Sequence, residues 1–109
     1  LVLPAAAYLR AQRLRRQLRH SVQPLFAQLD CLLTPTASNV APEPSTTGDA
    51  RFQAIWSLLG VPTLSLPSGL SAERLPFSIQ LIAAPWREAT LLAAARWCEQ
   101  QLTPLPAPL

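Results

Sequence analysis

The chain has 109 residues, of which 50% are hydrophobic and 14% charged, and its formal net charge is +3. This length suffices for one small domain. No apolar run approaches the roughly 20 residues that a membrane-spanning helix needs, so we expect no membrane partner. Twelve prolines against three glycines predict many fixed breaks between elements and few mobile glycine loops.

The chain begins with leucine and contains no methionine. Because translation starts with methionine, we expect a segment of a longer polypeptide. The first residues do not resemble a secretory signal, since the basic residues follow the apolar ones and no long apolar stretch comes after them. Cys31 and Cys98 lie far apart without a CxxC spacing, which favours two buried free thiols in a cytoplasmic protein. A disulfide stays open as the alternative.

All nine basic residues are arginines, and five of them lie in the first twenty positions. A helix that carries so many arginines could bind nucleic acid or an anionic membrane. The arginines are spread around most of the polar face and aromatic residues are few, so we favour a solvated face and expect no nucleic-acid partner. His20 has no second histidine and no matching carboxylate pair, which favours an exposed polar residue over a ligand or base.

The N-terminal part predicts an amphipathic helix over residues 4–23, with Pro4 in its first turn. Apolar residues recur every third or fourth position and would form one stripe: Ala7, Ala11, Leu14, Leu18 and Val22. Pro24 should end or kink this helix, because proline lacks the backbone donor. The apolar run at residues 31–33 then predicts a short buried strand, and the residues from 38 to 47 predict a surface loop.

The next segment gives the clearest helical pattern. Phe52, Ile55, Trp56 and Leu59 fall on one face, Asp49 can cap the N-terminus, and a glycine and a proline at positions 60 and 62 end the helix. Phe52 and Trp56 could line a substrate channel, although an aromatic stripe on a helix is more often core. Asp49 could contact substrate, but capping alone would explain it.

Alternating apolar and polar residues predict two further strands, at residues 63–66 and 77–81. A last helix follows at about residues 88–102, and residues 103–109, with three prolines, should be an extended tail. The fold class is therefore α/β, with about three helices packed on a partial mixed sheet of about three strands. Three short strands do not complete a sheet of ordinary size, so we expect the other strands in sequence outside this chain.

Four stretches occur in an order that resembles the C-terminal third of the amidase-signature family: DCLLTPT (30–36), FQAIWSLLGVP (52–62), LSLPSG (64–69) and LPFSIQLI (75–82). The resemblance assigns residues 1–102 to the C-terminal part of an amidase domain. It implies hydrolysis of an amide C–N bond by a lysine, a bridging serine and a nucleophilic serine. Two positions depart from the family pattern, because Ser57 stands where asparagine is usual and Ser78 where glycine is usual.

None of the implied catalytic parts is present, because the chain has neither a lysine nor a glycine-rich serine loop. Arginine cannot replace the lysine, since it stays protonated. We therefore expect this chain alone to be inactive and assign it no catalytic residue, metal or cofactor. Its expected contribution is part of the sheet and a wall of the substrate channel, with Asp49, Phe52 and Trp56 as channel residues.

The resemblance also bears on substrate and partners. The glutamine-using branch of the family has an acidic residue where Ala50 stands, which argues against a glutamine amidotransferase. Residues 80–88 (QLIAAPWRE) are similar to members that act on small ureido compounds, such as carboxybiuret hydrolases. Expected partners are thus a small amide or ureido substrate and the remainder of the amidase chain, and a homodimer stays open. The alternative function is a truncated, non-catalytic interaction or structural domain.

Overall fold

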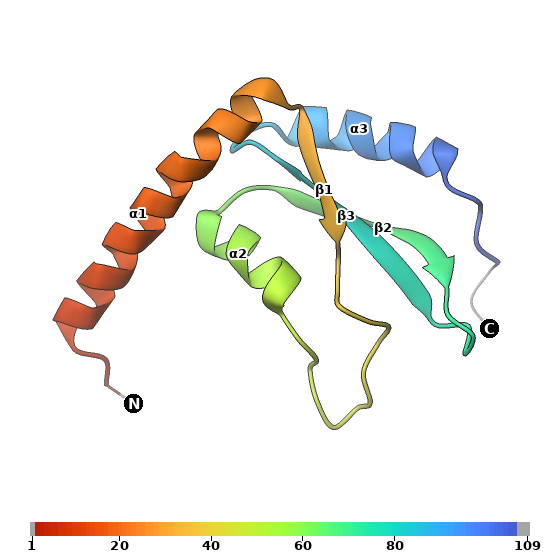
Figure 1. Cartoon of the computed structure of the whole chain (residues 1–109), viewed down its shortest axis with the longest axis horizontal. Helices are drawn as coiled ribbons and strands as arrows, with labels where there is room; N and C mark the ends of the chain where they lie inside the picture. The colour runs from red at the N-terminus through yellow and green to blue at the C-terminus, as the bar shows by residue number, and fades with distance from the viewer. Residues whose placement is uncertain (1, 107–109) are drawn as a thin grey trace.

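The computed structural model describes residues 2–106, which form three helices and three strands (Figure 1). In chain order these elements are α1 (Ala5–Gln28), β1 (Cys31–Pro35), α2 (Arg51–Leu59), β2 (Thr63–Leu70), β3 (Pro76–Ala83) and α3 (Glu88–Gln101). This confirms the expected α/β order of helix, strand, helix, strand, strand, helix. Residues 103–106 of the predicted tail lie outside any helix or strand, and residues 107–109 lie outside the described residues.

The sheet has the strand order β1-β3-β2. The expected mixed pairing is not found, because both pairs within the described residues are antiparallel. β2 and β3 are joined by only five residues, and so short a connection allows a hairpin but no parallel crossover. Leu81 in the central strand lies opposite Leu33 of β1 and Leu64 of β2, so apolar side chains of all three strands share one face.

β2 is longer than its alternating pattern predicted. It continues through Pro67 to Leu70, with a register irregularity between Pro67 and Gly69. Proline is tolerated here because β2 is an edge strand, and a bulge at the edge absorbs the extra residue.

The first helix also runs further than predicted. It begins at Ala5 and ends at Gln28, so Pro24 lies inside it. The missing N–H of Pro24 would have bonded the carbonyl of His20, and His20 is exposed, so water can satisfy that carbonyl. No residue of α1 is buried, and of the predicted apolar stripe only Leu18 and Val22 are half-buried.

The two faces of the sheet meet different helices. On one face, residues of β2 and β3 pack against α3 in a single core cluster: Leu66, Leu81, Ala83, Leu91 and Ala95. On the other face, Ile82 and the last residue of α2, Leu59, are fully buried. Because successive residues of a strand point to opposite faces, Gln80 lies on the α2 face with Ile82. This face carries the polar residues described next.

Candidate functional site

The centre of the candidate site is Gln80, which is buried with 3% of its surface exposed. Its side-chain Nε2 donates hydrogen bonds to the hydroxyl of Thr34 at 3.0 Å and to the carbonyl of Pro35 at 3.2 Å, both in β1. The same nitrogen donates to the carbonyl of Phe52 in α2 at 2.6 Å. One side chain of the central strand therefore joins the end of β1 to the first turn of α2.

Hydroxyl groups continue this polar surface along the same face. The side-chain oxygens of Thr36 and Ser65 lie 2.8 Å apart, and Ser65 Oγ also donates to the carbonyl of Ile79 at 3.4 Å. Thr36 stands just beyond β1, where its backbone N–H donates to the carbonyl of Ser78 at 2.9 Å. Among residues 2–106, the face of the sheet next to the start of α2 thus presents hydroxyl and amide groups and no ionised side chain.

A cavity of about 440 Å³ opens beside these hydroxyls. It lies between the segment that follows β1 and the hairpin end of β2 and β3, and its polar side chains include Thr36, Asn39, Ser68 and Ser78. None of the described side chains that line it is charged. Such a surface can accept and donate hydrogen bonds to an uncharged polar group, and Phe77, which is 43% exposed, adds an apolar wall.

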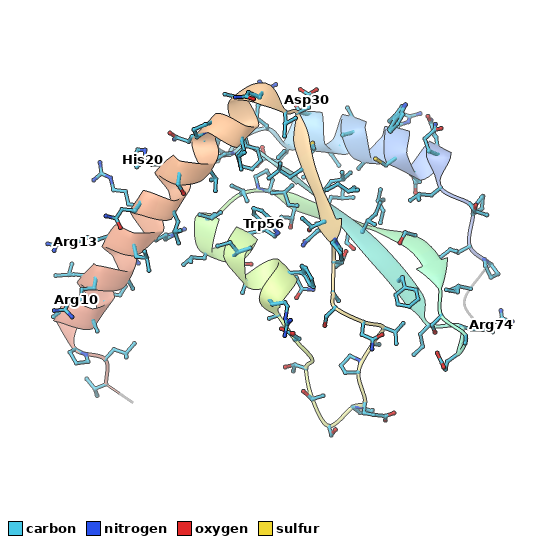
Figure 2. All side chains as sticks on the ribbon, in the orientation of Figure 1. Arg10, Arg13, His20, Asp30, Trp56 and Arg74 are labelled. Carbon is cyan, nitrogen blue, oxygen red and sulfur yellow. The ribbon has the colours of Figure 1, made fainter. Side chains whose placement is uncertain are left out.

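The structure places Asp49 just before α2, Phe52 in its first turn and Trp56 one turn later. Phe52 and Trp56 are half-buried, and Figure 2 shows Trp56 beside α2 near β1. Asp49 precedes the helix and forms an ion pair with Arg51. Gln80 brings the backbone of Phe52 against the sheet, whereas Asp49 bonds only within its own segment.

The capping prediction for Asp49 is only partly right. Its carboxylate accepts a hydrogen bond at 2.9 Å from the backbone N–H of Arg51, the first residue of α2. The N-cap position itself is Ala50, which makes no side-chain capping bond. The predicted helix end is confirmed, because Gly60 adopts the left-handed conformation with φ 68° and its N–H bonds the carbonyl of Trp56 at 2.9 Å.

The bond from Gln80 to the carbonyl of Pro35 stays within the sheet. Sequence reasoning missed the bond from Gln80 to α2 and the contributions of Thr34, Thr36 and Ser65. Polar residues at every second position, in T-P-T (34–36), T-L-S (63–65) and S-I-Q (78–80), mark one shared polar face. Strand pairing, which no single stretch contains, was needed to bring them together.

The two cysteines are free and half-buried. Burial raises the pKa of the Cys31 thiol above its ordinary value, and the neighbouring Asp30 and Cys98 raise this pKa further. A thiol of this kind is protonated near neutral pH and is a poor nucleophile. Among residues 2–106, no group of three histidine, cysteine or acidic side chains is placed to hold a metal ion.

The basic residues of α1 lie away from this site. Figure 2 shows Arg10, Arg13 and His20 projecting from the outer side of the helix, as expected for a solvated face. Arg15 differs from them, because its Nε donates a hydrogen bond to the carbonyl of Leu58 at 2.5 Å and so holds α1 against the end of α2. None of the helices between residues 2 and 106 combines the length and the hydropathy that a membrane span requires.

Comparison with known proteins matches residues 3–92 to the family model described as Amidase. A fatty acid amide hydrolase of Medicago truncatula is 36% identical over 88% of this chain and 18% of its own length. A glutamyl-tRNA(Gln) amidotransferase subunit of Anaeromyxobacter sp. (strain K) is 39% identical over 94% of this chain and 23% of its own length. The chain thus spans about a fifth of the length of these curated relatives.

Solved structures give the same result. A crystal structure of an amidase superposes with a TM-score of 0.83 at 29% identity, over 93% of this chain and 26% of that one. A second structure, described as a vestigial protein complex that reveals the origins of an s-triazine catabolic enzyme, superposes with a TM-score of 0.77 at 30% identity. It covers 97% of this chain and 26% of that one. This chain belongs to the amidase family.

Proposed function

We propose that this chain is the C-terminal part of an amidase that hydrolyses an amide C–N bond in a small substrate. The observation that carries the proposal is the match of the amidase family model to residues 3–92. The order of the four motifs between residues 30 and 82 supports the C-terminal placement. Residues 1–102 would form this part of the amidase domain, and residues 103–109 a tail.

The catalytic groups would come from polypeptide outside these 109 residues. All nine basic residues of the chain are arginines, and a guanidinium does not release its proton in the pH range of enzymes. A lysine amine can become neutral when desolvation lowers its pKa, and it can then accept a proton from a serine. The chain therefore cannot supply the base that the family resemblance implies.

The contribution of this chain would be a wall of the substrate channel. Asp49, Phe52 and Trp56 are the proposed channel residues, and the polar face around Gln80 adjoins Phe52. The Asp49 carboxylate is already paired with Arg51, so this wall offers little attraction to a cationic substrate group. An uncharged amide or ureido group would suit this surface.

The exposed helix α1 supports a place within a larger assembly. Several of its large apolar side chains are about half exposed, among them Tyr8 at 58%, Leu9 at 54% and Leu14 at 55%. An exposed apolar surface of this kind is typical of a face that packs against further polypeptide. The candidates are the remainder of the amidase chain and a second copy of this chain. The free cysteines support a cytoplasmic location.

The whole gene provides the experiment. We expect the part of the reading frame before Leu1 to encode a lysine and a glycine- and serine-rich stretch. Replacing that lysine by alanine should abolish ammonia release from a small amide, whereas Arg16→Met in this chain should leave it nearly unchanged. A reading frame with neither feature would favour the alternative, a non-catalytic interaction or structural domain.

A further inference from the structure

Gln80 is the only buried polar side chain among residues 2–106. Burying an amide is unfavourable unless its hydrogen bonds are made inside the protein. Its two N–H groups face three acceptors, and two of these, the carbonyls of Pro35 and Phe52, cannot donate. The orientation of the amide is therefore fixed, with nitrogen toward β1 and α2.

Within the described residues, few other side-chain hydrogen bonds fix the beginning of α2. The helix has nine residues, which is too short to be stable on its own in water. Its C-terminal end is well held, because Leu59 is fully buried and Arg15 bonds the carbonyl of Leu58. At its N-terminal end, Ala50 makes no side-chain capping bond, and Asp49 bonds only to its near neighbour Arg51.

We propose that Gln80 is a positioning residue, which fixes the first turn of α2 against β1 and so sets where Phe52 lines the substrate channel. The expected effect of Gln80 on catalysis rests on the proposed function. Its role in fixing α2 rests only on the 2.6 Å bond from Gln80 to Phe52 and on the bonds to Thr34 and Pro35. Because Gln80 holds a wall residue and no reacting group, its loss should affect substrate binding more than the chemical step.

Three variants of the polypeptide that the whole gene encodes test this role. Gln80→Met keeps the length of the side chain and removes its donors. Gln80→Glu keeps the shape but turns a carboxylate oxygen toward two carbonyls. Gln53→Met is the matched control, because Gln53 lies exposed on α2, the helix that Gln80 is proposed to fix. Each variant is compared with the wild type by hydrogen exchange of backbone amides and by the KM and kcat of amide hydrolysis.

With Gln80→Met, we expect amides in and just after the first turn of α2 to exchange about tenfold faster, while those of α3 change little. KM should rise several-fold, with a smaller change in kcat. At pH 8, exchange in α2 should be faster and KM higher in Gln80→Glu than in Gln80→Met. Both should return toward the wild-type values measured at the same pH as the pH falls toward 5, because a protonated carboxyl again supplies a donor. If Gln80 only filled space, Gln80→Glu at pH 5 would recover no further than Gln80→Met. Gln53→Met should match the wild type in every measurement.

Unchanged exchange in α2, or equally faster exchange in α2 and α3, would overturn the positioning role. An unchanged KM in an active enzyme would overturn its consequence for the substrate channel. If the wild type hydrolyses no amide, the proposed function fails, and the exchange rates still decide whether Gln80 fixes α2. Should Gln80→Met fail to fold, Gln80→Glu is compared with the wild type at pH 5, where wild-type protection in α2 supports the role of the donor and faster exchange in α2 and α3 alike overturns it.

Discussion

The hydroxyl oxygens of Thr36 and Ser65 lie 2.8 Å apart, although β3 separates the segments that carry them. Thr36 is bonded to β3 through its backbone N–H, and Ser65 through its side chain to the carbonyl of Ile79. The pair therefore forms a polar bridge across the central strand. This bridge lies on the face of the sheet where the candidate site is found.

We expect the bridge to contribute measurable coupling between the two edges of the sheet. Thr36→Val and Ser65→Ala should each lower the free energy of unfolding by about 0.5–1.5 kcal/mol. In a double-mutant cycle measured by denaturation, the coupling energy should be about 0.5 kcal/mol or more. Thr47→Val, in the exposed loop, should change stability by less than about 0.5 kcal/mol. Strict additivity of the two changes would show that the bridge adds nothing.

Gly60 is predicted to resist substitution for two reasons. Its φ of 68° is unfavourable for residues with a Cβ, and a Cβ there would stand 3.2 Å from Nη2 of Arg15. Gly60→Ala should therefore cost about 1–2 kcal/mol of stability. Gly69→Ala is the matched control, since no atom lies within 4 Å of a Cβ at that position, and it should be near neutral. Equal effects of the two changes in thermal or chemical denaturation would contradict this reasoning.

Arg15 is expected to stabilise the contact between α1 and α2. Arg15→Met keeps much of the aliphatic stem but removes the hydrogen bond to Leu58, which should cost about 1 kcal/mol, because the bond is exposed. Hydrogen exchange should rise in the middle of α1, which has no buried residue to hold it. Arg16→Met serves as the control and should leave exchange unchanged. A larger effect from Arg16→Met than from Arg15→Met would rule out the proposed contact.

The Cys31 thiol should react slowly with iodoacetamide at neutral pH. Its pKa is raised by burial, and Asp30 and Cys98 add to the rise, so little of the reactive thiolate is present there. Because its pKa is raised in the folded state, the Cys31 thiol adds to the free energy of unfolding at pH values below its pKa in the unfolded chain. This contribution is lost as the pH rises through the pKa of the folded state. Measurement in a Cys98→Ser variant isolates Cys31. Alkylation of the folded variant as fast as that of the same variant unfolded in urea would contradict the raised pKa.

Much of the fold followed from local patterns. The positions of all six elements were predictable, because alternation, helical periodicity and Gly60 act within a few residues. The extent of β2 was not predictable, because Pro67 is acceptable only on an edge strand, and edge position depends on pairing. The continuation of α1 past Pro24 depended likewise on exposure, which the pattern of residues 4–23 did not reveal.

The candidate site was less predictable than the fold. Phe52 and Trp56 could be singled out because they share one face of a helix. The bond from Gln80 to the carbonyl of Phe52 joins residues 28 apart, and only the packing of α2 on the sheet creates it. Asp49 was expected to cap α2, but it stands one residue before the N-cap, and its bonds stay within the loop segment.

The most direct measurement compares ammonia release by two polypeptides, the 109-residue chain alone and the product of the whole gene, on the same small amide. We predict release by the longer polypeptide and none above the uncatalysed rate by the 109 residues, since arginine cannot act as the neutral base. Enzymatic release by the 109-residue chain, purified free of other amidases, would contradict the claim that the catalytic groups lie elsewhere.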